Sequence, residues 1–186
     1  ESFLAKIERY GVYAAALIPL IIFRDYISPF HFGKVLVFRS LVEIMAVLFV
    51  LLVWRDRSYL PRPNPILWAV LAFAAVFSLT TATSVLPYAS FWGSLERMGG
   101  LWTFWHYIIF FVIATSVLRE RQHWFRFMEL FVFVGVLSAL YGFGQKTDST
   151  LFIGSGGRER IFGTIGNAAL FAGYEIINFF LPLSKF

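Results

Sequence analysis

Cysteine is absent from this 186-residue chain, and charged residues are scarce. Without cysteine the chain can form no disulfide framework, no cysteine-ligated zinc site and no thiol nucleophile. Only 15% of its residues are charged and 59% are hydrophobic, whereas soluble domains have roughly 25% charged and about 45–50% apolar residues. A water-soluble globule of this length cannot bury so much apolar surface. The composition therefore excludes most soluble enzymes and disordered tails, and it predicts a polytopic membrane protein.

Signatures of metal binding and nucleophilic catalysis are also missing. The three histidines, His31, His106 and His123, have no spacing of the His-x-x-x-His kind that binds a metal. The nucleophile signature Gly-x-Ser-x-Gly does not occur. We therefore expect no metal and no cofactor, and no catalytic residue is assigned. A single histidine in a membrane helix, such as His106, is more often a hydrogen-bonded interior residue than a ligand.

Aromatic residues, by contrast, are abundant: the chain has 23 Phe, 8 Tyr and 6 Trp. Aromatic side chains suit the interfaces of a bilayer. The net charge is +5, with a pI near 9.7. A basic balance can indicate nucleic-acid binding, but in a membrane protein Lys and Arg in the loops set the orientation. We therefore expect membrane lipids, and no nucleic acid, among the partners.

Apolar runs separated by compact polar breaks predict one all-α transmembrane domain over residues 1–186. A helix that spans a bilayer needs about 20 mostly apolar residues. Pro19 interrupts the first run, and Pro65 and Pro182 mark helix ends, where proline is tolerated. The six predicted spans are 10–27, 34–54, 66–86, 101–118, 125–143 and 162–183.

The distribution of Lys and Arg between the loops predicts the orientation. Nine of these cations lie on the side that includes the amino terminus, and six lie on the other side. We therefore expect a cytoplasmic amino terminus, with the loops 87–100 and 144–161 facing outward.

The two outward loops and one span carry the candidate binding residues. Arg97 lies in a glycine-bounded outward loop, where its alternative roles are lipid-phosphate binding or pairing with Glu96. Arg158 and Arg160 follow a Gly/Ser stretch and precede a helix start at Asn167, and such a helix end favours a bound anion. Guanidinium groups bind phosphate in a bidentate fork.

Charges inside a predicted span are costly and indicate function. Arg39 and Glu43 are four residues apart, so they can pair. Lys34 and Arg39 fall near the outer end of their span. The hypothesis is that five cations share one outward-facing anionic pocket: Lys34, Arg39, Arg97, Arg158 and Arg160.

Further along the chain, polar residues form a stripe on the last predicted span. Asn167, Tyr174, Glu175 and Asn178 have offsets that place them on one helical face. Such a face normally points into the helix bundle. Interhelical hydrogen bonding is the favoured role for Asn178, and the role of Glu175 stays open.

The two outward loops together resemble those of the bacterial O-antigen ligase and O-antigen polymerase family. The segments are 90–100 (SFWGSLERMGG) and 160–167 (RIFGTIGN), of which the second is similar to the family's Arg…Gly-Thr-x-Gly-Asn-Pro helix start. Pro19, Lys34 and Arg39, together with Glu43, also stand where related sequences tend to have them. The resemblance covers nearly the whole chain.

The resemblance implies a multi-helix GT-C type glycosyltransferase of the bacterial inner membrane, in lipopolysaccharide biosynthesis, that needs neither a nucleotide sugar nor a metal. Such an enzyme takes a glycan from an undecaprenyl-pyrophosphate carrier on the periplasmic side. It transfers the glycan to lipid A–core, to another glycan or to a protein. Arg160 would match an arginine that binds the carrier's pyrophosphate, and Arg97 is a second candidate.

The sequence departs from the family pattern in two places. The family's Asn-Pro pair is Asn167-Ala168 here. The large loop that carries the family's histidine thought to act as the base would lie downstream of Phe186. We therefore expect the chain to be an amino-terminal portion that is inactive alone. The rival hypotheses are a transporter or flippase of lipid-linked or anionic substrates, and a membrane scaffold subunit.

Overall fold

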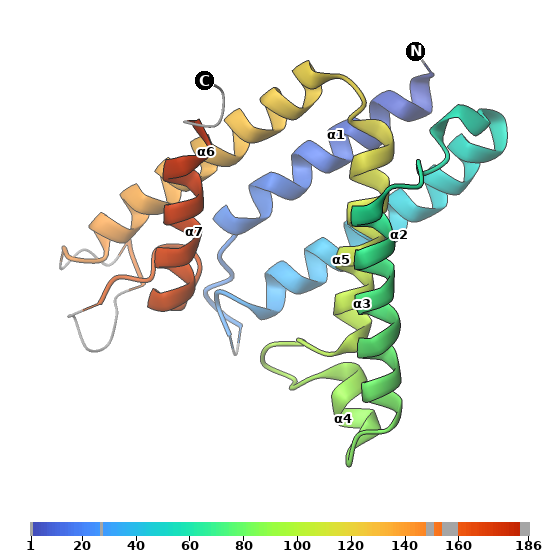
Figure 1. Ribbon diagram of the computed structural model, residues 1–186. Coiled ribbons are helices and arrows are strands. Elements are labelled where there is room, and N and C mark those ends of the chain that lie inside the picture. The colour runs from blue at the N-terminus through green and yellow to red at the C-terminus, as the bar shows by residue number, and fades with distance from the viewer. Residues whose placement is uncertain (1, 27, 148–150, 154–159, 183–186) are drawn as a thin grey trace. The chain divides into compact units, whose positions relative to one another are not determined.

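The computed structural model describes residues 2–26, 28–147, 151–153 and 160–182. Within these residues the chain is helical and has no strand, which confirms the all-α prediction. Two short 3₁₀ helices, η1 (Ile18–Leu20) and η2 (Arg57–Tyr59), accompany the α-helices (Figure 1). The α-helices of the described residues are α1 (Phe3–Leu17), α2 (Phe32–Arg55), α3 (Pro65–Ala82), α4 (Pro87–Trp92), α5 (Leu101–Val117), α6 (Arg121–Gly144) and α7 (Ala168–Phe180).

Three of these helices are long and apolar enough to cross a membrane, namely α2, α3 and α6. Helices α5 and α7 are apolar but shorter. The structure thus supports membrane-spanning helices, while the count of six spans and the orientation of the amino terminus stay predictions.

The first predicted span differs most from the helix that forms there. Helix α1 ends at Leu17, and Pro19 lies in the 3₁₀ turn that follows. Ile21 then adopts an extended conformation. Proline lacks the backbone N–H that a continuing helix needs and clashes with the preceding turn, so the apolar run beyond Leu20 does not extend α1.

The chain divides into two compact units. The first unit comprises Glu1–Val12 and Val35–Arg121, and the second comprises Tyr13–Lys34 and Gln122–Phe186. Helices α1 and α2 each contribute to both units.

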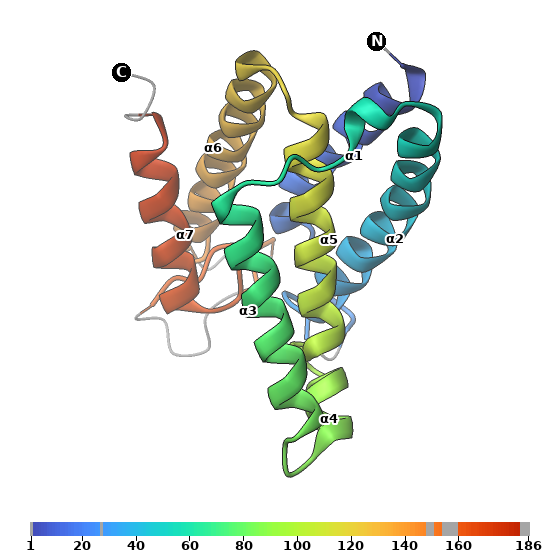
Figure 2. The same ribbon diagram turned by 45° about the vertical axis from the view of Figure 1, so that its right-hand side comes forward.

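In the first unit, α3 and α5 lie side by side, with α4 beside them (Figures 1 and 2). Asn64 caps α3 by accepting from the Leu67 amide at 2.9 Å, and Pro65 occupies the first turn, where it is preorganised for a helix. The ring of Phe104 packs edge-on against Phe77, with centroids 4.7 Å apart. Apolar packing of this kind sets the position of α5, which carries part of the candidate site.

In the second unit, α6 and α7 pack together through small residues. The rings of Phe131 on α6 and Tyr174 on α7 lie 5.1 Å apart. Phe171 packs against Gly142 and Gly163, and a Cβ atom at Gly163 would come within 2.4 Å of the Phe171 ring. Glycine at these two positions therefore leaves room for the Phe171 ring of α7 against α6 and the loop that contains Gly163.

Candidate functional site

The segment 160–167, which was singled out from the sequence, is held in place by a buried glutamine. The side chain of Gln145 is at the carboxyl end of α6 and is only 6% exposed. Its Oε1 accepts from the amides of Phe162 (3.2 Å) and Gly163 (3.0 Å). Its Nε2 donates to the carbonyl oxygens of Ile153 (3.0 Å) and Gly163 (3.3 Å). One side chain thus satisfies four backbone groups of the loop.

Two further side chains hold the centre of the same segment. The hydroxyl of Ser138 on α6 lies 2.7 Å from the hydroxyl of Thr164 and also accepts from the Thr164 amide at 3.3 Å. The ammonium of Lys34 donates to the Thr164 carbonyl oxygen. Lys34, in the first turn of α2, therefore contacts the loop that starts at Arg160.

The sixth predicted span, 162–183, begins as this loop and becomes helical only at Ala168. Gly163 and Gly166 have positive φ angles of 54° and 83°, which glycine adopts without strain. Asn167 is extended and caps α7, since its Oδ1 accepts from the amides of Ala169 (3.0 Å) and Leu170 (3.1 Å). Asn167 thus lies off the helical face of Tyr174, Glu175 and Asn178, and the predicted four-residue stripe is wrong at its first member.

The second unit consequently offers a basic site at the amino terminus of a 13-residue helix. Arg160 is exposed and lies seven residues before the Asn167 cap. Lys34 donates to the Thr164 carbonyl oxygen of the loop between Arg160 and α7. Basic side chains near the amino terminus of a helix favour a phosphate-bearing ligand.

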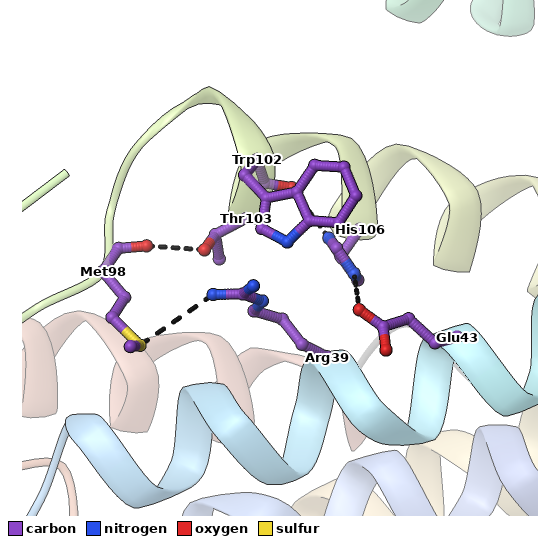
Figure 3. Close-up of polar contacts among 6 residues, drawn as sticks. All are labelled: Arg39, Glu43, Met98, Trp102, Thr103 and His106. Atoms are coloured by element: carbon purple, nitrogen blue, oxygen red, sulfur yellow. Dashed lines mark hydrogen bonds and ion pairs between the residues drawn. The ribbon is translucent and has the colours of Figure 1, made fainter. Parts of the chain in front are cut away.

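A polar cluster in the first unit joins α2, α5 and the loop between α4 and α5 (Figure 3). His106 is 2% exposed. Its Nδ1 lies 2.7 Å from the Trp102 carbonyl oxygen, and its Nε2 lies 3.1 Å from Glu43 Oε1. The prediction that His106 is a hydrogen-bonded interior residue is therefore confirmed.

Arg39 does not pair with Glu43, although their spacing allows it. Its guanidinium lies between the Met98 sulfur, 3.9 Å from Nη1, and the Trp102 ring, whose centroid is 5.8 Å from Cζ (Figure 3). Glu43 turns to His106 instead, because the buried imidazole requires a partner. The Arg39–Glu43 pairing is thus wrong.

The conformation of the loop before α5 presents Met98 to Arg39. Met98 has a positive φ of 48°, and its carbonyl oxygen accepts from the Thr103 hydroxyl at 2.5 Å. Gly93 has a φ of 75°, and a Cβ atom there would come within 2.6 Å of the Gly99 and Gly100 amides. The glycines of segment 90–100 therefore close a tight loop over the start of α5.

The five cations of the predicted pocket are distributed over both units. Lys34 and Arg160 belong to the second unit, whereas Arg39 and the exposed Arg97 belong to the first. Arg158 lies outside the described residues. The pocket shared by all five cations therefore stays a prediction.

The residues that organise the loop, Ser138 and Gln145, were not predicted from the sequence. A signal for them exists, because Ser138, Tyr141 and Gln145 have spacings of three and four and so share one face of α6. Tyr141 belongs to the same set, since its hydroxyl accepts from the Ile153 amide at 3.0 Å. A polar stripe at the carboxyl end of α6 thus indicated a support for the loop that follows.

Across the described ranges, no three His, Asp or Glu side chains gather closely enough to hold a metal ion. No family model matches the chain, and no curated protein or solved structure shows significant similarity to it.

Proposed function

We propose that the chain is the membrane portion of an O-antigen ligase-like glycosyltransferase. It takes a glycan from undecaprenyl pyrophosphate and transfers it to lipid A–core, to a glycan or to a protein. The proposal includes six spans in the bacterial inner membrane, a cytoplasmic amino terminus and periplasmic functional loops. The resemblance of segments 90–100 and 160–167 to that family suggested this function.

The observation that carries the proposal is the contact of Lys34 with the loop that begins at Arg160. The Lys34 ammonium binds the Thr164 carbonyl oxygen, while Gln145 fixes the loop backbone around Gly163. The site therefore has a preset backbone, two cations and the amino terminus of α7. Such a site suits a ligand that carries several negative charges close together, as a pyrophosphate does.

These residues would serve transfer by stabilising the leaving group. When the bond between the glycan and the carrier breaks, negative charge develops on the departing pyrophosphate. Cations that are already positioned stabilise this charge without reorganising. Arg160 would bind the phosphate oxygens, and Lys34 would hold the loop while adding positive charge. No residue of the chain is assigned as the base that activates the acceptor.

A binding measurement tests the pyrophosphate site. The chain in lipid nanodiscs is titrated with fluorescent undecaprenyl pyrophosphate, with undecaprenol as the uncharged comparison. Arg160→Ala and Lys34→Met should each weaken binding by about tenfold, because each removes a charge-assisted interaction. Arg62→Ala removes a cation from the connector between α2 and α3 and should leave affinity unchanged. Equal affinity for undecaprenol would refute the site.

A transfer assay separates the proposed enzyme from a transporter. Membranes containing the protein are given an undecaprenyl-pyrophosphate-linked glycan with a fluorescent label, together with lipid A–core. Transfer of label that depends on Arg160 supports the glycosyltransferase. Movement of the labelled lipid across sealed vesicles without transfer supports a flippase.

A further inference from the structure

The described lining residues of the groove between α6 and α7 include one acidic side chain and no basic one. The groove has a volume of about 840 Å³. Both helices supply large apolar side chains to it, among them Val136, Leu140, Ile176 and Phe179, and these are exposed by 52–70%. Its polar lining residues are Glu175 and Asn178, and none of its described lining residues is positively charged. Figure 2 shows the two helices side by side.

Two acceptor oxygens at this groove have no hydrogen-bond partner among the described residues. Oε1 of Glu175 and Oδ1 of Asn178 are both buried and unpartnered. Asn178 is 5% exposed, and its Nδ2 donates to the Tyr174 carbonyl oxygen of its own helix at 3.0 Å. The amide oxygen of Asn178 therefore remains an acceptor without a donor among the described residues. Acceptors in an apolar setting are unfavourable unless a donor reaches them.

The helix packing keeps these residues at the groove. A Cβ atom at Gly135 of α6 would come within 2.6 Å of Cγ and Nδ2 of Asn178, so the glycine makes room for the amide. Glu175 is three residues before Asn178, which puts it on the same side of α7. The carboxylate is therefore held at the groove by the packing of α7 on α6.

We propose that this groove binds an apolar membrane helix that carries a lysine or arginine side chain, which pairs with Glu175. The exposed apolar walls suit the body of such a helix, because membrane helices associate through close packing and interhelical hydrogen bonds. A cation on the bound helix would neutralise the Glu175 carboxylate. An ammonium has three N–H donors, which is enough for both Glu175 and the amide oxygen of Asn178. A hydrocarbon chain would fill the groove but would leave the acceptors without a donor.

The test measures association between the chain and designed helices in lipid vesicles. Because the chain has no cysteine, Thr147→Cys in the turn that follows α6 accepts a single donor dye. The probes are a polyleucine transmembrane peptide with one central lysine and the same peptide with leucine there, each carrying an acceptor dye. The lysine peptide should bind about tenfold more tightly, as expected for one interhelical polar contact.

Variants of the chain then assign the preference to the groove. Glu175→Gln should reduce the preference for the lysine peptide to near unity while the leucine peptide binds as before. Glu175→Asp keeps the charge and should retain a preference, which guards against a loss caused by misfolding. Val136→Phe fills the groove and should weaken the binding of both peptides. Glu96→Gln removes an exposed acid of the first unit and should change neither affinity.

Three results would overturn the proposal. The first is equal binding of the two peptides to the unmodified chain. The second is a lysine preference that survives Glu175→Gln. The third is a groove filled by lipid, seen when brominated acyl chains quench a dye at Thr147→Cys and neither peptide relieves the quenching.

Discussion

Nε2 of His106 lies 3.1 Å from Oε1 of Glu43, while Nδ1 of the same ring lies 2.7 Å from the carbonyl oxygen of Trp102. A carbonyl oxygen only accepts, so Nδ1 carries a proton. Nε2 faces the Glu43 carboxyl group of α2. The imidazole of α5 therefore connects the Trp102 backbone to the side chain of Glu43 on α2.

Loss of Glu43 should destabilise the first unit. Glu43→Ala leaves Nε2 of the buried His106 without a partner, which costs about 1–3 kcal/mol. Glu43→Gln keeps a hydrogen-bonding group in place and should retain most of the stability. Denaturant unfolding in detergent micelles measures the difference, with Glu96→Ala as the exposed control. If Glu43→Ala unfolded at the same denaturant concentration as the unmodified chain, the contact between Glu43 and His106 would have no structural role.

Substitution by alanine at two glycines of the second unit should change the stability of the protein in opposite directions. Gly135→Ala forces the buried Asn178 side chain to move and should cost about 1–2 kcal/mol. At Gly173 a Cβ atom would meet nothing within 4 Å, so Gly173→Ala should stabilise α7 by about 0.5–1 kcal/mol. Thermal unfolding of both variants in one detergent gives the comparison. Equal shifts would contradict the packing of Gly135 on Asn178.

The hydrogen bonds between Gln145 and the loop should slow hydrogen exchange of the loop amides. Gln145→Ala removes the acceptor of the Phe162 and Gly163 amides and should cost about 2 kcal/mol or more, because several buried backbone groups lose partners together. Hydrogen–deuterium exchange of segment 161–164 should therefore accelerate. Gln122→Ala, at an exposed glutamine near the start of α6, is the matched control. Unchanged exchange in the Gln145 variant would show that the loop is held by other groups.

The connector between α2 and α3 should make stability depend on pH. Hydrogen bonds from the side chain and amide of Ser58, together with the charge of Arg119, lower the pKa of Asp56 below its ordinary value. A lowered pKa in the folded state means that the stabilisation is present above the ordinary pKa of the carboxyl group and is lost as the pH falls through the folded value.

Asp56→Asn removes this titration. Melting curves between about pH 7 and pH 2, a range that brackets the ordinary aspartate pKa, should show the unmodified chain as more stable at neutral pH. The two chains should converge at the acidic end. A constant difference across the range would mean that the charge of Asp56 does not contribute.

Much of the fold could be predicted from composition and from proline positions. The apolar runs located the helices because a helix in or near a bilayer must satisfy its own backbone, and Pro65 marked the start of α3. The early end of α1 could be read only in part, because Pro19 indicated an interruption but not that the following apolar residues would be extended. The short helix α4 lay within a predicted loop, where six residues give no clear period.

The residues of the candidate sites could be predicted from the sequence, but the partners with which they interact could be predicted less well. Arg160, Lys34 and Asn167 were selected by charge and by their place at helix ends, which are local properties. The partner of Glu43 was not local: the spacing allowed Arg39, whereas the structure chose His106, 63 residues away. A buried imidazole must find a partner, and only tertiary packing decides which acceptor is near.

Sequence alone was sufficient for properties that follow from solvation and local geometry: an all-helical chain, with an apolar majority and a small charged remainder. Tertiary structure decided which polar groups meet. It brought Lys34 to Thr164 across 130 residues, and it placed Glu175 in an apolar groove whose described lining residues include no cation. Hydropathy depends on each residue separately, whereas a hydrogen bond or ion pair needs two groups within about 3 Å of each other, and only the folded chain sets that distance.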